Sequence, residues 1–343
     1  MRKVLVDEAV GMELGYDITK IVPGKEKYRA FRRGHVIKPE DVSRLKDMGK
    51  QYVYVWLPGD NMIHEDEAAL RIARAAAGPG IAYTEPSQGR VNLKACHAGL
   101  LKVQTAQLNW LNNLENVVFA TLHSNRVVAK DQKVAGTRVV PVAIGLSLLE
   151  EAERLSREPG PLLYIKPFKP LRVAVVITGS EVSSGRIKDG FAQTIQEKIR
   201  PFGGRWMGQT IVPDDAGLIA KGIQNFVTEG ADLIMATGGM SVDPDDATPK
   251  GIRSTGARVV FYGAPVLPGS QFMLAYQGDV PILGVPGGAL FSRVTTLDLI
   301  LPRIFAEDRI ERADIVGLGH GGMCEECAIC RYPLCPFGKG NSI

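Results

Sequence analysis

The sequence lacks the motifs that mark the common nucleotide-binding and hydrolytic enzymes. No G-x-G-x-x-G turn joins a predicted strand to a helix, which disfavours a dinucleotide fold of the Rossmann type. There is no G-x-x-x-x-G-K-[ST] phosphate loop and no G-x-S-x-G nucleophile elbow. No apolar run approaches the roughly 20 residues that cross a bilayer. Acidic residues also interrupt the N-terminus, so we expect no membrane contact, no signal peptide and a cytoplasmic protein.

The sequence also has little net charge. The formal net charge is +4 on 343 residues, and no dense stripe of Lys and Arg stands out. This balance permits an anionic small ligand and gives no reason to expect nucleic acid as a partner. A chain of this length predicts two or three domains. Composition shifts and Pro-Gly breaks predict a small α+β unit at 1–60, a middle α+β domain with a linker at 61–168, an α/β domain at 169–308 and a cysteine-rich tail at 309–343.

The third segment alternates strand and helix patterns. The run 171–178 (LRVAVVIT) is continuously apolar, as is typical of a strand buried on both faces. Further strands are expected at 205–212, 231–236, 258–262 and 280–285, and helices at 191–202, 216–229, 248–254 and 289–304. Such alternation predicts an α/β fold with a mainly parallel sheet between two helix layers. Ligands of these sheets bind beyond the carboxyl ends of the strands.

Glycine-rich turns with oxygen-bearing side chains follow three of these strands. They read Thr-Gly-Ser-Glu at 178–181, Thr-Gly-Gly-Met-Ser-Val-Asp-Pro-Asp-Asp at 237–246 and Pro-Gly-Gly-Ala at 286–289. Glycine lets the backbone approach a ligand closely and adopts positive φ at little cost. Exposed N–H groups in such turns suit a phosphate or another oxyanion. The turns therefore predict a binding site for a small anionic ligand.

Taken in chain order, these turns resemble a known family. With Asp214-Asp215 and Pro268-Gly269 between them, they are similar to the molybdopterin-binding domains of molybdenum-cofactor biosynthesis proteins of the MoeA, gephyrin and MogA type. Shorter pieces at 6–11, 33–37, 53–55 and 135–141 also resemble that family. The resemblance touches most of the chain, and the second half carries it strongly.

The resemblance implies a three-layer molybdopterin-binding fold and a set of site residues. Molybdopterin is the implied ligand, with Mg²⁺ and molybdate, and relatives of this kind suggest a homo-oligomer. The implied catalytic carboxylates are Asp246, Glu181 and Asp243. The implied ligand-binding residues are Thr178, Gly179, Ser180, Gly238, Gly239, Ser241, Pro268, Gly269, Pro286, Gly287 and Gly288.

The carboxylates leave more than one interpretation open. Asp243, Asp245 and Asp246 would repel an anion unless Mg²⁺ bridges them to it. They could instead accept hydrogen bonds from the amino and ring N–H groups of a pterin. Asp246 could also act as the N-cap of the helix that begins near Ala247.

Three departures from the family pattern bear on activity. The Pro-Gly-Lys-Pro turn reads Pro-Gly-Ser-Gln at 268–271 and so loses its basic residue, and Pro-Gly-Asn-Pro reads Pro-Gly-Gly-Ala at 286–289. Asp243 stands where the family usually has Gly. Two functions therefore remain open: insertion of molybdate into adenylated molybdopterin, or a non-catalytic carrier or sensor of the cofactor.

The tail contributes a separate motif. Cys324, Cys327, Cys330 and Cys335 lie within a dozen residues, and a cytoplasmic protein rarely keeps structural disulfides. The spacing resembles that of ferredoxins with one extra residue, which favours a [4Fe–4S] cluster, and the same thiolates could close a Zn²⁺ site with His320 nearby. We expect Cys96 to be simply buried.

Overall fold

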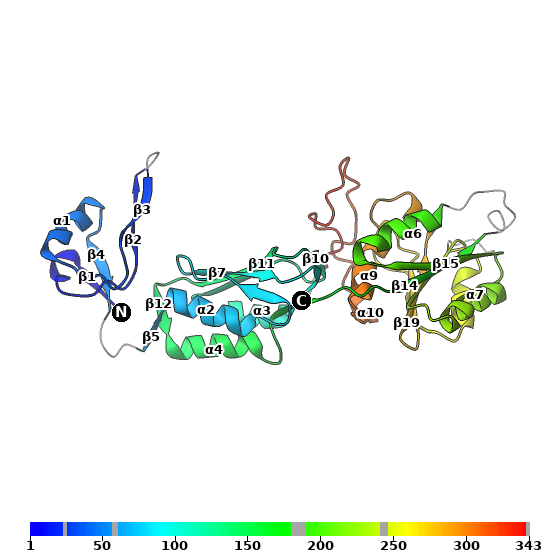
Figure 1. Cartoon of the computed structure of the whole chain (residues 1–343), viewed down its shortest axis with the longest axis horizontal. Helices are drawn as coiled ribbons and strands as arrows, with labels where there is room; N and C mark the ends of the chain where they lie inside the picture. The colour runs from blue at the N-terminus through cyan, green and yellow to red at the C-terminus, as the bar shows by residue number, and fades with distance from the viewer. Residues whose placement is uncertain (23–25, 57–60, 180–189, 241–245, 341–343) are drawn as a thin grey trace. The chain divides into compact units, whose positions relative to one another are not determined.

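The computed structural model of the chain describes residues 1–22, 26–56, 61–179, 190–240 and 246–340 (Figure 1). The chain forms two compact units. Unit 1 comprises residues 1–94, 106–122 and 133–163, and unit 2 comprises 95–105, 123–132 and 164–343. The division into four segments made from the sequence is finer than this and stays a prediction. Among the described residues, no helix is both long and apolar enough to cross a membrane.

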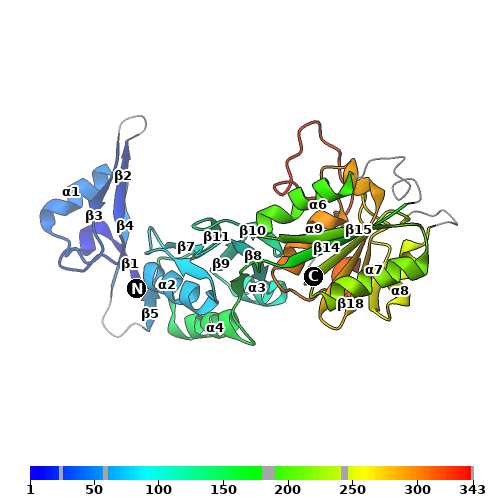
Figure 2. The same ribbon diagram turned by 45° about the vertical axis from the view of Figure 1, so that its right-hand side comes forward.

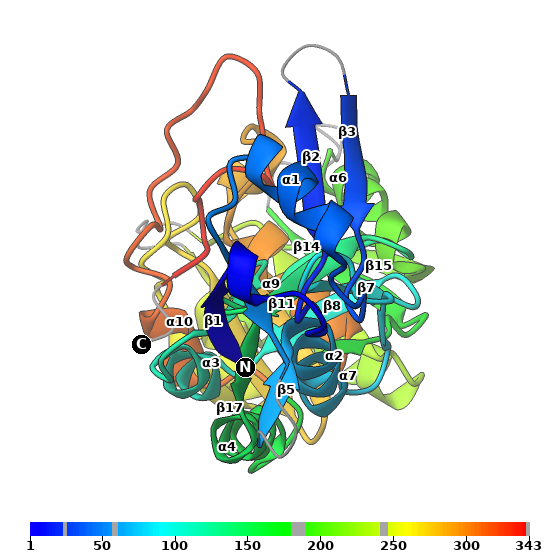
Figure 3. The same cartoon turned by 90° about the vertical axis from the view of Figure 1, so that its left-hand side faces the viewer.

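Unit 1 begins with a small α+β assembly. Its elements are β1 (Arg2–Leu5), the 3-10 helix η1 (Val6–Glu8), β2 (Ile18–Val22), β3 (Glu26–Phe31), α1 (Pro39–Asp47) and β4 (Tyr52–Val55). β1 pairs antiparallel with β4. β2 pairs antiparallel with β3, and these two strands stand side by side in Figure 3. Val6, Leu14 and Leu45 are fully buried between them. Gly49 follows α1 with φ +74°, the left-handed residue that commonly ends a helix.

The rest of unit 1 packs helices against short sheets. The elements are β5 (Met62–His64), α2 (Glu65–Ala76), β6 (Ile81–Tyr83), β7 (Arg90–Ala95), α3 (Thr105–Asn112), β9 (Val117–Thr121), β11 (Lys133–Val139), β12 (Ala143–Gly145) and α4 (Leu146–Arg157). One sheet has the order β6-β7-β11-β9, and β12 pairs with β5. Arg71 on α2 donates two hydrogen bonds to Glu153 on α4, at 2.9 and 2.8 Å. This bidentate pair fixes the two helices side by side.

Unit 2 is organised around a six-stranded sheet. The strands are β14 (Arg172–Thr178), β15 (Arg205–Val212), β16 (Leu233–Thr237), β17 (Arg258–Tyr262), β18 (Met273–Gln277) and β19 (Val280–Val285), in the order β15-β14-β16-β19-β18-β17. The first four strands of that order run parallel. β18 runs antiparallel to both neighbours and was not expected from the sequence. The sheet is therefore mainly parallel, as predicted, with a reversed edge.

Helices cover both faces of this sheet. They are α6 (Phe191–Ile199), η2 (Arg200–Phe202), α7 (Ala216–Thr228), α8 (Thr248–Ser254), η3 (Gly287–Leu290), α9 (Thr296–Phe305) and α10 (Arg312–Val316). Helices α6 and α9 cover one face and α7 and α8 the other (Figure 2). Val173, Val175 and Ile177 of β14 pack in the cluster on the first face, and Ala174 and Val176 in the cluster on the second. The continuous apolar run follows from this burial on both sides. The predicted three-layer α/β fold is confirmed.

Two expectations for unit 2 were wrong in detail. The helix expected at 289–304 begins only at Thr296, because Thr295 and Asp298 form a capping box ahead of it. The linker expected at the end of the 61–168 segment includes part of β13 (Leu163–Lys166). This strand forms a small sheet with β8 (Gly99–Val103) and β10 (Arg126–Val128) in the order β10-β8-β13.

Candidate functional site

Four parallel strands end side by side at one edge of the sheet. Thr178 of β14 pairs with Val212 of β15, and Thr237 of β16 lies between Ile177 and Val285. The turns that follow these strands therefore leave the sheet at the same edge. This is the edge at which parallel α/β sheets bind ligands.

The first two glycines after β16 are required by their surroundings. Gly238 has φ +90°, and a Cβ there would collide with the backbone carbonyl of Thr178. Gly239 has φ +48°, and its Cβ would stand 3.2 Å from Asp214 Oδ1 and 3.3 Å from the hydroxyl oxygens of Thr178 and Thr248. The backbone at these two residues is therefore enclosed by one carboxylate and two hydroxyls, which we call the glycine corner.

Hydrogen bonds fix the hydroxyls of the glycine corner. Thr248 Oγ1 donates to the carbonyl oxygen of Gly238 at 2.8 Å. This leaves Thr178 Oγ1 to donate to Thr248 Oγ1, 3.1 Å away. Both threonines are buried. The corner is thus preorganised by its own side chains.

A further threonine at this edge has no partner. Thr237 is fully buried, and its Oγ1 makes no hydrogen bond with any described residue. Leaving a buried hydroxyl unpaired costs about 1–3 kcal/mol. Unpaired polar groups of this kind are uncommon in folded proteins and are often found at binding sites. The unpaired hydroxyl of Thr237 is therefore consistent with a polar ligand at this edge of the sheet.

The two Pro-Gly turns lie in different surroundings. Gly269 has φ +107° and rests on the start of α9, where Thr296 Oγ1 donates to its carbonyl oxygen at 2.7 Å. Gly287 and Gly288 follow β19 and are exposed, with no atom near the position of an added Cβ. Pro268 lines a cavity described below, and Pro286 is buried. Gly238 and Gly239 lie against Thr178, whereas Gly269 contacts Thr296 of α9.

The structure describes only some of the predicted site residues in the turns after β14 and β16. Ser180, Glu181, Ser241 and Asp243 lie outside the described residues. Asp246 is described and immediately precedes Ala247, which is the N-cap of α8 and makes no side-chain capping bond. The alternative in which Asp246 itself caps that helix is therefore wrong.

Sequence analysis missed three residues of this region. Thr248 was interpreted only as the start of a helix, and Thr237 was placed in the turn at 237–246 without being assigned to the site. Asp214 contributed to the family resemblance without being assigned to the site. The aspartate pair was a usable signal, because only Pro213 separates it from β15, and Asp215 is the N-cap of α7.

The four tail cysteines line one cavity of about 480 Å³, which Pro268 and Tyr332 also line. Cys324 and Cys335 are half-buried, and Cys327 and Cys330 are exposed. Burial raises the pKa of Tyr332, and the charges of Asp298, Cys335 and Cys330 add to this. In the described part of the chain, no group of three or more His, Cys, Asp or Glu side chains has the geometry to hold a metal ion. Cys96 is exposed, so the expectation of simple burial was wrong.

A doubly covered, mainly parallel sheet with a glycine corner at the strand ends defines an α/β ligand-binding domain. Residues 174–306 match the family described as "Probable molybdopterin binding domain". This match confirms the resemblance noted in the sequence for that part of the chain. Residues 3–57 match a second family, described only as a domain of unknown function.

Individual relatives agree with the family match. A molybdopterin molybdenumtransferase of Synechococcus elongatus is 24% identical over 181 residues, which are 50% of this chain and 42% of that protein. A CinA-like protein of Citrifermentans bemidjiense is 37% identical over 78 residues, 23% of this chain and 19% of that protein. The molybdopterin biosynthesis enzyme MoaB of Thermus thermophilus aligns with 41% of this chain and 98% of its own, at 22% identity and a TM-score of 0.34. The chain thus spans less than half the length of the molybdenumtransferase and of the CinA-like protein.

Proposed function

We propose that unit 2 binds molybdopterin at the glycine corner and that the protein acts in molybdenum-cofactor biosynthesis. The observation that carries the proposal is the glycine corner itself, inside the segment that matches the molybdopterin-binding family. Gly238 and Gly239 bring bare backbone against Thr178, Thr248 and Asp214. A corner of this kind offers both hydrogen-bond donors and acceptors to a polar ring.

Each group of the corner has a definable task in this proposal. Backbone N–H groups of the turns donate to the phosphate of the ligand, since no side chain shields them. The carboxylate of Asp214 accepts from the amino and ring N–H groups of the pterin. The Thr178–Thr248 hydrogen bond keeps these groups in position before the ligand arrives. The ligand is therefore oriented by a rigid edge of the sheet.

Molybdate insertion is the finer form of the proposal. Its implied carboxylates are Glu181, Asp243 and Asp246, of which only Asp246 is described. Mg²⁺, which the family resemblance implies beside these carboxylates, stays a prediction. Molybdate as substrate, a homo-oligomer and a cytoplasmic location stay predictions.

The binding proposal predicts saturable titration of the purified full chain with molybdopterin under anaerobic conditions. Replacing the carboxylate in Asp246→Asn is expected to weaken binding about tenfold, the effect of losing roughly 1.4 kcal/mol. The matched control is Asp279→Asn, which removes a fully exposed aspartate and is expected to leave affinity unchanged. No saturation by the wild-type chain would refute the proposal, and equal affinity of the Asp246 variant would remove that residue from the site.

A turnover arm of the same experiment separates the two functions left open. The chain is incubated with adenylated molybdopterin, molybdate and Mg²⁺, and molybdenum bound to the pterin is measured. Insertion that is lost in Asp246→Asn supports a transferase. Binding without insertion supports the carrier or sensor.

The cysteine tail favours a second candidate function, in which a thiolate-bound metal regulates pterin binding. Two backbone hydrogen bonds join the tail to Leu267, the residue before the Pro268-Gly269 turn. Leu267 N donates to Gly322 O, and Cys324 N donates to Leu267 O, both at 2.8 Å. Four cysteine side chains around one cavity match the usual ligands of zinc and of iron–sulfur clusters. A metal there would hold the segment that contacts the turn.

We therefore expect the anaerobically purified chain to contain about one zinc ion, or about four iron and four sulfide ions, per molecule. The double substitution Cys327→Ser with Cys330→Ser is expected to abolish the metal, while Cys96→Ser retains it. Elemental analysis measures the content, and a brown colour distinguishes the cluster from zinc. A chain that stays metal-free after reconstitution with zinc, and also with iron and sulfide, would rule this candidate out.

A further inference from the structure

A larger cavity of unit 2 is separate from the glycine corner. It has a volume of about 650 Å³, within the range of small-molecule sites. The segment 123–127, the helix α9 and the tail at 332–340 form most of its wall. None of the residues predicted to bind the pterin lines it. An occupant of this cavity would therefore be a second ligand.

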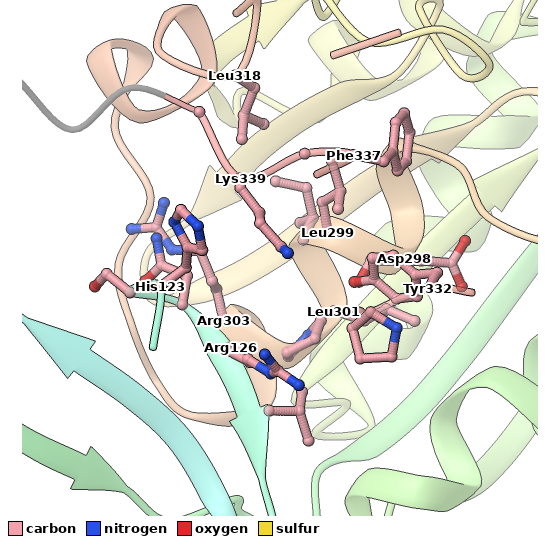
Figure 4. A pocket seen from close by; sticks show the side chains of 18 of the residues that line it. His123, Arg126, Asp298, Leu299, Leu301, Arg303, Leu318, Tyr332, Phe337 and Lys339 are labelled. Atoms are coloured by element: carbon pink, nitrogen blue, oxygen red, sulfur yellow. The ribbon is translucent and has the colours of Figure 1, made fainter. Parts of the chain in front are cut away.

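Three basic side chains at this cavity have no acidic partner among the described residues. Figure 4 shows His123, Arg126 and Lys339 around the same hollow. The Nε of Arg126 is buried and makes no hydrogen bond to any described residue. Lys339 Nζ donates only to the carbonyl oxygen of Leu334, at 3.3 Å. Within the part of the chain that the structure describes, no carboxylate pairs with Arg126 or Lys339.

The other charged groups at the cavity are already paired. Lys198 Nζ lies 2.6 Å from Asp298 Oδ1. Arg303 pairs with Asp308 at 2.7 Å and with Asp314 at 3.2 Å. The charges within these pairs nearly cancel and leave Arg126 and Lys339 as the net positive charge, with the His123 ring beside them. Their convergence is unfavourable unless an anion joins them.

This environment lowers the pKa of His123. Partial loss of hydration lowers the pKa of its imidazole, and the nearby charges of Lys339 and Arg126 lower it further. The free ring is therefore kept neutral at a pH where an ordinary histidine begins to charge. A bound anion would reverse this effect and raise the pKa of His123.

Another part of the cavity wall is apolar, with Asp298 and Tyr332 beside it. Leu299 and Leu301 of α9 and Phe337 of the tail contribute to it (Figure 4). A free inorganic anion would contact only the basic side. A molecule that carries a phosphate on an apolar or aromatic body would satisfy both sides.

We propose that this cavity binds an organic phosphate, with His123, Arg126 and Lys339 as the groups that hold the phosphate. Guanidinium and ammonium donors with a histidine are common phosphate ligands. The apolar wall selects for the organic body. The proposal goes beyond pterin binding at the glycine corner and does not depend on it.

The test uses phenyl phosphate and AMP as probes, with phenol and inorganic phosphate for comparison, on the full chain by calorimetric titration. We expect saturable binding of an organic phosphate, at least tenfold tighter than inorganic phosphate, and none of phenol. The double variant Arg126→Gln with Lys339→Gln is expected to weaken binding at least tenfold. The control pair Lys130→Gln with Lys221→Gln removes the same charge from exposed residues outside the cavity, and should bind as wild type.

A second readout keeps the test independent of folding defects and of the pterin site. The NMR titration of the His123 ring, assigned with His123→Gln, is expected to move to higher pKa when the probe binds. Asp246→Asn should leave this shift intact, so failure at the glycine corner is recognised separately. If neither probe saturates, or if the double variant binds as well as the control pair, the proposal is overturned.

Discussion

Asp308→Asn is expected to lower the unfolding free energy of the chain by about 3–5 kcal/mol, the usual cost of breaking a buried ion pair. Asp308 accepts from Lys102 Nζ at 2.8 Å and Arg303 Nε at 2.7 Å, and Lys166 Nζ lies 3.4 Å away. Its side chain is 13% exposed and those of Lys102 and Arg303 are 17% and 8% exposed. Removing the carboxylate charge leaves three cations facing one another with little water to screen them.

The same network predicts how stability depends on pH. Burial on its own raises the pKa of Asp308, but the hydrogen bond from Lys102 and the charges of Arg303 and Lys102 outweigh it and hold the pKa below its usual range. A carboxyl group with a lowered folded-state pKa stabilises the fold above its unfolded pKa of about 4 and loses this contribution as the pH falls. Wild-type stability should therefore drop below about pH 4 more steeply than that of Asp308→Asn.

Urea denaturation at several pH values measures both effects. Asp279→Asn is the control, because Asp279 pairs with Arg309 at the fully exposed surface. Such pairs contribute little to stability. If Asp308→Asn proved as stable as that control at pH 7, the ion pairs of Asp308 would make no contribution to the free energy of unfolding.

Gly238→Ala is expected to destabilise unit 2 by about 3 kcal/mol or more and to abolish pterin binding. An alanine at φ +90° costs about 1–2 kcal/mol by itself. The added Cβ also meets the carbonyl of Thr178, which is backbone in a buried strand and cannot move aside without disturbing β14. Thermal and urea unfolding measure the loss.

Gly288→Ala provides the matched comparison. The resemblance to the molybdopterin-binding family implies that both glycines contact the ligand, but nothing lies near a Cβ added at Gly288. Its stability should stay within about 0.5 kcal/mol of wild type. A folded Gly288→Ala chain with weakened pterin binding would identify a glycine that serves only the ligand. Equal stability of the Gly238 and Gly288 variants would contradict the packing of the corner.

Some helices and strands of unit 2 could be predicted from local sequence pattern, and others could not. Strands β15, β17 and β19 and helix α8 begin and end where the sequence predicted, because alternating apolar runs and flanking turns mark them clearly. β18 was missed because its five residues lie in one short apolar run between turns. Such a run has no periodicity that distinguishes a strand from a buried loop. α9 was predicted too long because the capping box at Thr295 was overlooked.

The sequence by itself determined the α/β class of unit 2 and the similarity of this segment to molybdopterin-binding domains, since these depend on local pattern and motif order. Only the tertiary structure revealed that Thr248 and Asp214 enclose Gly239, that Asp308 compensates cations from distant segments, and that His123, Arg126 and Lys339 converge. Those relations join residues up to 216 positions apart, from 123 to 339. Contacts between segments so far apart in the chain arise from packing, which leaves no periodic signal in the sequence.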